Sequence, residues 1–310
     1  MFEQDEIIER TDSRHRTLSP LASFYALFIC TLFGANAVAI KITLTGLGVF
    51  TAAGIRFSIA AVAICLWAGV TGQPMRIKQG QVHQLFIIAA LFVTQVCLFY
   101  LGLSKTYASR GALIVNLVPF FILIISHLFI PEDRITLKKL IGIVMGFAGV
   151  AFVFLDKEGI SGEFRTGDVI ILAATILWAC SGIYTKKIID DYEPFQLVIY
   201  PMLLSIPVFF IAAVLFDATM IGRFSPEVIL ALLYQGLITG SFGFVAWNLL
   251  LQRYGAVSLH TFIFIMPVVG VCLSTLILGE PITGNILIAL GLIAAGIFIT
   301  QVSLKRTGMI

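Results

Sequence analysis

Long apolar segments alternate with short polar ones along the whole chain. Each apolar segment is about 20 residues long, the length that an α-helix needs to cross a hydrocarbon core about 30 Å thick. None of the polar connections is long enough to hold a soluble domain. The pattern predicts ten membrane-spanning helices at residues 20–41, 50–70, 83–103, 109–130, 135–155, 168–187, 195–217, 226–250, 256–278 and 283–303.

The composition agrees with this pattern. Of the 310 residues, 59% are hydrophobic and 12% are charged, roughly half the charged fraction of a soluble globular protein. A water-soluble domain and a disordered chain are therefore excluded, and the net charge of +3 is too small for a nucleic-acid binder. The first residues are polar and acidic, unlike a signal peptide, so we expect the first span to stay as an anchor. The fold class is an all-α integral membrane protein.

The orientation follows from the lysines and arginines near the span ends, which favour the cytoplasmic side. Thirteen of these cations fall on the side that holds both termini, and six fall on the other side. We therefore expect a multi-pass protein of the inner membrane with both termini in the cytoplasm.

The chain also repeats itself. The segment LFGANAVAIK, which ends at Lys41, aligns with LWACSGIYTK, which ends at Lys186, and Pro119 aligns with Pro267. Each copy holds five spans, and because five is odd the second copy enters the membrane in the opposite sense. Inverted repeats of this kind are a recurrent architecture of secondary transporters. The expected parts are a cytoplasmic tail at 1–19, a first repeat at 20–156, a second repeat at 168–303 and a cytoplasmic tail at 304–310.

Two segments resemble the C-terminal signature of an EamA-type repeat. Each contains a proline (Pro119, Pro267), an acidic residue just past the span (Glu132, Glu280) and then a glycine-punctuated helix. The first copy departs modestly, with PED where the second copy reads GEP.

Lys41, late in the first span, and Arg56, early in the second, are also similar to that family. The resemblance is to the drug/metabolite transporter superfamily and covers about residues 20–303. It implies two inverted five-helix EamA-like repeats that mostly export small metabolites, with spans 1–4 and 6–9 around a central site and spans 5 and 10 at the periphery. It does not specify the substrate.

Charged and catalytic groups are scarce in the spans. All 17 carboxylates fall in the termini, in loops or at helix ends, whereas a charge at mid-membrane costs at least ~2.5–3.5 kcal/mol and usually marks an ion relay. We therefore expect no buried carboxylate that carries protons, and a neutral, zwitterionic or mildly anionic solute. The chain has no HExxH motif, phosphate-binding loop or pair of core carboxylates. We expect no enzymatic activity, no ATP hydrolysis, no cofactor and no metal.

Uncharged polar and aromatic residues gather near the span centres and are the candidates for the solute site. In hydrocarbon such polar groups need hydrogen-bond partners. One interpretation is interhelical bonding, worth ~0.6 kcal/mol per contact, and some aromatic rings suit the membrane interface instead. The other interpretation is a lined midplane site. The expected substrate-binding residues are Asn36, Gln95, Tyr100, Asn116, Trp178, Ser181, Gln235 and Ser241.

A second set of residues is a candidate for hinges, for gating and for coupling of transport to protons. Pro119 and Pro267 interrupt equivalent spans and favour kinks that act as hinges. Arg56 and Lys41 either snorkel to the interface or serve gating or the attraction of an anionic group. His260 is the candidate for proton coupling, with a hydrogen-bonded packing role as the alternative.

The function that these features favour is secondary transport by alternating access, as an exporter of an amino acid or comparable metabolite. A passive channel and a non-transporting membrane sensor are the alternatives. The expected partners are the lipid bilayer and a small solute, without nucleic acid. The Gly142-xxx-Gly146 and Gly291-xxx-Ala295 pairs predict either close packing within the chain or the seam of a homodimer.

Overall fold

The computed structural model describes residues 19–73, 75, 77, 80–129, 135–156, 162–260 and 262–301. Within these ranges the chain is helical, and a single antiparallel bridge between Leu47 and Ile221 stands outside the helices. The helices in chain order are α2 (Pro20–Thr43), α3 (Val49–Thr71), α4 (Val82–Lys105), α5 (Ala108–Val115), α6 (Val118–Phe129), α7 (Leu137–Leu155), α8 (Gly162–Ile188), η2 (Ile189–Asp191), α9 (Pro194–Phe216), α10 (Pro226–Leu233), the π-helical η3 (Tyr234–Gly243), α11 (Phe244–His260), α12 (Ile265–Leu278) and α13 (Gly284–Gln301).

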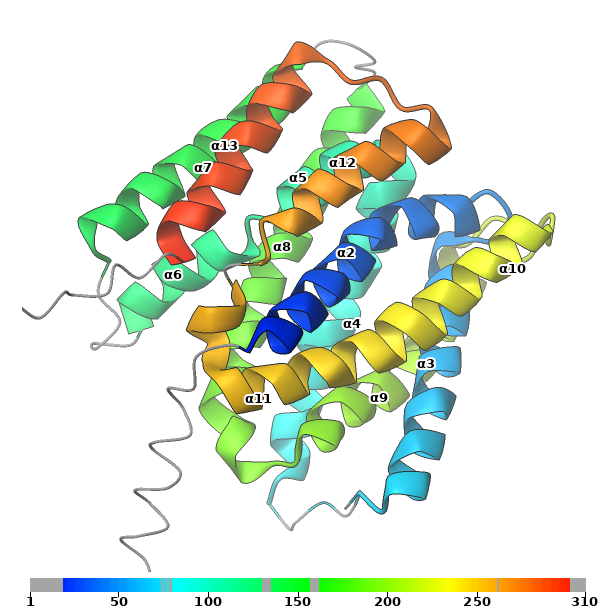
Figure 1. Ribbon diagram of the computed structural model, residues 1–310. Coiled ribbons are helices and arrows are strands. Elements are labelled where there is room, and N and C mark those ends of the chain that lie inside the picture. Colours follow the sequence, from blue (N-terminus) through cyan, green and yellow to red (C-terminus); the bar gives the residue numbers. More distant parts are fainter. Residues whose placement is uncertain are drawn as a thin grey trace, which may run out of the picture.

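Eight helical stretches of the described chain are long and apolar enough to cross a membrane. Two further apolar helices, Ile265–Leu278 and Gly284–Thr300, are shorter. The all-α fold class is confirmed, but ten full-length spans are not. The ninth expected span, 256–278, is divided because α10, η3 and α11 continue as one rod to His260, as Figure 1 shows in yellow and gold. Only α12, with 14 residues, remains after the turn.

The expected kinks at the two prolines take the form of helix breaks. In the first repeat α5 ends at Val115 and α6 begins at Val118, so that Pro119 lies in the first turn of the new helix. In the second repeat α12 begins at Ile265 and Pro267 again lies in its first turn. A proline costs no hydrogen bond there, because the first amides of a helix have no intrahelical partner.

Helices α7 and α13 pair at the edge of the bundle (Figure 1). A Cβ atom at Gly142 would lie 2.7 Å from the carbonyl oxygen of Gly296, and one at Gly296 would lie 2.7 Å from the carbonyl oxygen of Gly142. The glycines therefore let the two backbones touch. Gly291, on the other side of α13, has no atom within 4 Å of the position of a Cβ.

One end of the bundle, which we call the Glu280 end, gathers the turns that follow α2, α4, α9 and α12. There the second repeat supplies carboxylates to helices of the first. Asp217 accepts hydrogen bonds from the amides of Phe50 (3.2 Å) and Thr51 (2.9 Å) at the start of α3. Glu280 accepts hydrogen bonds from the amides of Ala108 (2.6 Å) and Ser109 (2.9 Å) at the start of α5. A carboxylate is favourable at a helix N-terminus because it satisfies free amides and opposes the helix dipole.

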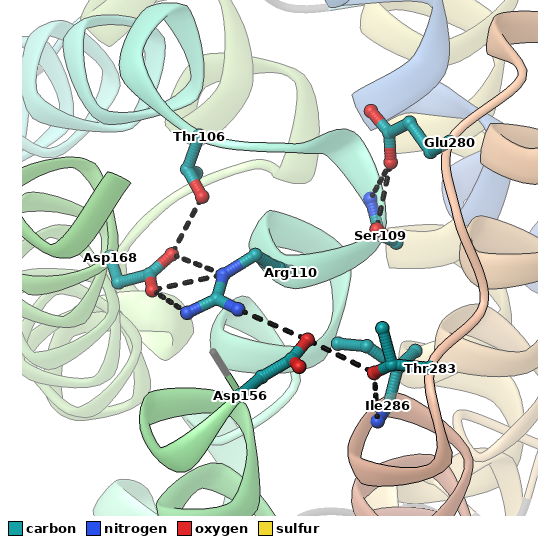
Figure 2. A network of polar contacts seen from close by, with 8 residues as sticks. All are labelled: Thr106, Ser109, Arg110, Asp156, Asp168, Glu280, Thr283 and Ile286. Atoms are coloured by element: carbon teal, nitrogen blue, oxygen red, sulfur yellow. Dashed lines mark hydrogen bonds and ion pairs between the residues drawn. The ribbon is translucent and has the colours of Figure 1, made fainter. Parts of the chain in front are cut away.

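A buried charge network lies at the same end (Figure 2). Arg110 donates from Nε to Asp168 Oδ2 (3.0 Å), and its Nη1 lies 3.5 Å from Asp156 Oδ2. The Thr106 hydroxyl donates to Asp168 (2.8 Å) and the Thr283 hydroxyl donates to Asp156 (3.0 Å). Each side chain of this network comes close to one from the other repeat or from a distant span.

Burial at this end goes beyond what the sequence indicates. Arg110 and Asp168 lie near helix starts, as expected, but Arg110 is 2% exposed and Asp168 is fully buried. The contacts also show that corresponding helices of the two repeats run in opposite directions. Helix α2 ends at the Glu280 end whereas α8, its counterpart in the second repeat, begins there.

At the opposite end, which we call the Tyr192 end, two tyrosine hydroxyls contact the segment between α3 and α4. The Tyr192 hydroxyl lies 2.7 Å from the carbonyl oxygen of Gln81 and 2.8 Å from Gln84 Oε1. The hydroxyl of Tyr200 donates to the carbonyl oxygen of Met75. These contacts join the segment between α3 and α4, and the start of α4, to Tyr192 before α9 and to α9 itself.

The α7–α13 contact makes a first prediction. We expect Gly142→Val to destabilise the protein by about 1–3 kcal/mol, because the added atoms must force the helices apart. Thermal unfolding in detergent measures the effect. Gly291→Val is the matched control, since the same residue there meets open space. Equal melting temperatures for the two variants would contradict the close contact.

The charge network makes a second prediction. Asp168→Asn removes the main partner of a fully buried cation, and breaking a buried pair typically costs about 3–5 kcal/mol. We expect the lower part of this range, because Asp156 stays within 3.5 Å of Arg110. The control is Asp191→Asn, which neutralises an exposed carboxylate. A melting temperature for Asp168→Asn that matches the control would show that the pair contributes no stability.

Candidate functional site

A chain of buried polar side chains joins the two repeats inside the bundle. Arg56 on α3 donates from Nη1 to the Tyr100 hydroxyl oxygen on α4 (3.2 Å), and that hydroxyl donates to Gln235 Oε1 on η3 (2.8 Å). The Gln235 amide nitrogen donates in turn to the carbonyl oxygen of Ala39 on α2 (3.1 Å). Each of the three side chains is 5% exposed or less.

Helix η3 allows this contact because of its geometry and its glycines. It is a π-helical segment of ten residues, and π-helical turns occur frequently at functional sites. A Cβ at Gly236 would lie 2.6 Å from Ile59 Cγ2 and 3.2 Å from the carbonyl oxygen of Arg56, so only a glycine lets η3 approach α3 this closely. The Thr239 hydroxyl, further along η3, lies 3.2 Å from Asn36 Oδ1 on α2.

Arg56 carries a charge that no described carboxylate neutralises. Both ion pairs among the described residues belong to Arg110, and Arg56 Nε is buried without a hydrogen-bond partner. Its guanidinium carbon lies 4.8 Å from the ring centroid of Phe57. Arg56 is seven residues after the start of α3 at Val49, which is about 10 Å along the helix axis. The snorkelling interpretation is wrong for Arg56, because the side chain is 5% exposed.

Lys41 has a different environment, at the Glu280 end of α2. Its ammonium group donates to the carbonyl oxygens of Leu103 (3.1 Å) and Thr106 (2.9 Å), where α4 ends. A cation is favourable at the C-terminus of a helix because it opposes the helix dipole and satisfies free carbonyls. Lys41 therefore ties α2 to α4 within the first repeat.

Gln95 is the second buried side chain with an unpartnered atom in a span interior. It is 3% exposed, and its Oε1 accepts no hydrogen bond from the described residues. It lies on α4 five residues before Tyr100. A buried acceptor without a partner costs free energy, so its persistence requires an explanation such as water or a ligand.

The structure brings only some of the expected site residues together. Asn36, Tyr100, Gln235 and Arg56 lie in or against the buried polar chain. The other expected residues lie apart from this polar chain. Asn116 donates to the carbonyl oxygen of Ala112 (2.7 Å) where α5 ends, and Ser241 donates to a carbonyl oxygen of its own helix. On α8, the ring of Trp178 contacts that of Phe99 on α4 (centroids 6.3 Å apart), and Ser181 is buried.

Two expectations fall outside the described residues. The side chain of His260 is not among them, so its role in proton coupling stays a prediction. Glu132, the first-repeat counterpart of Glu280, is also outside them.

Sequence reasoning missed the charge network and the π-helical segment. A signal for the network existed, because Arg110 begins a span while Asp156 and Asp168 end and begin the neighbouring spans on the same predicted side. The sequence did not show that the three side chains meet. The π-helical turns left no recognisable pattern beyond the glycines at 236, 240 and 243.

Comparisons with known proteins agree with this architecture. The model of the EamA-like transporter family matches residues 20–155 and again residues 165–302. A crystal structure of a protein superposes on 90% of this chain and 97% of its own with a TM-score of 0.68, at 17% sequence identity. At that identity the likeness shows the fold alone.

Curated relatives cover nearly the full chain. A protein of Escherichia coli described as a probable amino-acid metabolite efflux pump is 29% identical over 90% of this chain and 94% of its own. A protein of Salmonella typhimurium with the same description is 28% identical over 89% and 93%. A protein of Archaeoglobus fulgidus described as an uncharacterized transporter is 28% identical over 87% and 94%.

Because both halves of the chain match the same family model in an all-helical, membrane-spanning bundle, this multi-pass membrane protein belongs to the EamA-like transporter family, as the sequence signatures around the two prolines predict.

Proposed function

We propose that this protein is a secondary transporter that exports an amino acid or related small metabolite across the inner membrane by alternating access. The observation that carries the proposal is the Arg56–Tyr100–Gln235 chain, which joins helices of both repeats inside the spans. Polar groups shared between two repeats are suited to binding a solute whose access changes when the repeats move. The descriptions of the Escherichia coli and Salmonella typhimurium relatives support the solute class.

The unequal ends of the bundle support alternating access. At the Glu280 end, carboxylates of the second repeat hold the starts of α3 and α5, and α5 packs against α12. Toward the other end, α6 packs against α8 and α7, and among the described residues it makes no comparable contact with α11. With the Glu280 end on the outer side, as the cation distribution predicts, this conformation is closed to the outside.

Opening the Glu280 end requires the loss of several contacts at once. Glu280 must leave the amides of Ala108 and Ser109, and Asp156 must leave either Arg110 or Thr283. A charge-assisted hydrogen bond contributes about 1.5–3 kcal/mol, so contacts on the opposite side must replace much of this free energy. Because these contacts must be exchanged together, the bundle has two discrete conformations rather than a continuous range of conformations.

Counterflow in proteoliposomes tests the carrier function. Vesicles loaded with one unlabelled solute from a panel of amino acids, nucleosides and organic anions should accelerate the entry of the same labelled solute. A channel shows no such acceleration, and a sensor shows no flux for any solute.

A second series of counterflow measurements, with an imposed pH gradient, compares the wild type with His260→Ala. Proton coupling through His260 predicts loss of the gradient dependence, and an unchanged dependence excludes that role.

Gln95 separates a binding role from a packing role. Gln95→Leu keeps the volume but removes the unpartnered Oε1, so no hydrogen bond among the described residues is lost and stability should stay equal or rise. If Oε1 binds the solute, counterflow should fall about 10-fold, the equivalent of one hydrogen bond of about 1.4 kcal/mol. Thr94→Val, at an exposed neighbouring position, is the control. Unchanged counterflow would remove Gln95 from the site.

A further inference from the structure

The two buried arginines among the described residues have opposite environments. Arg110 is 2% exposed and has two carboxylates, Asp168 and Asp156, as partners. Arg56 is 5% exposed, yet its partners are the neutral Tyr100 hydroxyl and the face of the Phe57 ring. The described chain thus supplies counter-ions to the arginine at the end of the bundle and supplies none to the arginine in the span interior.

An unpaired buried guanidinium is expensive to keep. Removing a charge from water costs several kcal/mol even after relaxation, and a charge in the membrane interior adds to this cost. The contact with a neutral hydroxyl and an aromatic ring returns only part of it. In addition, Arg56 Nε is buried and donates no hydrogen bond to the described residues. The site is therefore complementary to an anion that the described part of the chain does not provide.

The surroundings hold the guanidinium in one orientation. Nη1 donates to the Tyr100 oxygen, the Tyr100 hydroxyl donates to Gln235, and the Gln235 amide nitrogen donates to carbonyl oxygens of α2 and α10. This leaves the Nε edge of the planar group for a ligand. Two parallel N–H groups on one edge match the two oxygens of a carboxylate.

We propose that Arg56 binds the carboxylate group of the transported solute. The inference rests on the proposed transport function and narrows its solute class to molecules that carry a carboxylate, such as free α-amino acids. Amines, amino-acid amides and permanent cations lack the group that Arg56 recognises. An inorganic anion such as chloride or phosphate is the other source of the same charge, and the experiment separates it from the solute.

The first arm of the test needs no variant. Leucine, threonine and phenylalanine are each compared with their amides, which keep the side chain and amine but lose the carboxylate. In wild-type counterflow of whichever labelled amino acid exchanges, we expect the amide to compete at least 100-fold more weakly than the acid. Equal competition by acid and amide would overturn the inference and leave the carrier function standing.

The second arm uses Arg56 variants. Arg56→Gln should reduce counterflow of the acid at least 100-fold, and Arg56→Lys, which keeps the charge but loses the planar fork, should retain part of the activity. Arg253→Gln, at an exposed position, is the control and should behave as the wild type. If Arg56→Gln weakened acid and amide to the same extent, Arg56 would have a structural role only.

A binding measurement tests the inference even for variants that do not transport any solute. The melting temperature of the detergent-solubilised protein is recorded with each acid, each amide, chloride and phosphate. We expect the acid, and not the amide, to raise the melting temperature of the wild type, and Arg56→Lys to reduce this shift. A shift with chloride or phosphate alone would assign the Arg56 site to an inorganic anion and overturn the inference. If no solute exchanged and no acid shifted the melting temperature, both the transport function and the inference would fail.

Discussion

In a bundle surrounded by hydrocarbon, a polar group without a partner inside the chain costs several kcal/mol, and this constraint arranges the molecule. The starts of α3 and α5 have amides without intrahelical partners, and Asp217 and Glu280 of the second repeat provide the acceptors. Arg110 is satisfied in the same way by Asp168. The two repeats are thus joined by the polar groups that each cannot satisfy alone.

The same constraint makes buried polar atoms without partners notable. Arg56 and Gln95 are buried in span interiors and keep atoms without partners among the described residues, whereas Arg110 at the Glu280 end has two carboxylate partners. Both lie on helices that contact the other repeat, and Arg56 lies beside the π-helical η3. A transporter needs polar groups that are satisfied by its solute, and a site that its own side chains had filled would have no affinity left for one.

The contrast between the two ends of the bundle relates this chemistry to movement. Carboxylates join the two repeats at the Glu280 end, and tyrosine hydroxyls join them at the Tyr192 end. The helix breaks before Pro119 and Pro267 lie between these ends, at equivalent places in the two repeats. The proposed alternating access requires the carboxylate contacts at the Glu280 end to open while contacts at the Tyr192 end close around the buried polar chain.

The sequence by itself determined the membrane class, the positions of most spans, the two repeats and the family, because hydrophobic length and repeated landmarks are local properties of the chain. It also identified Tyr100, Gln235 and Arg56 as polar residues in apolar surroundings. Only the tertiary structure decided which polar groups meet. Arg110 and Asp168 are 58 residues apart, and Tyr100 and Gln235 are 135 residues apart. Burial and pairing depend on the helices that close over a residue, so Arg110 became a neutralised structural cation and Arg56 became an unpaired one.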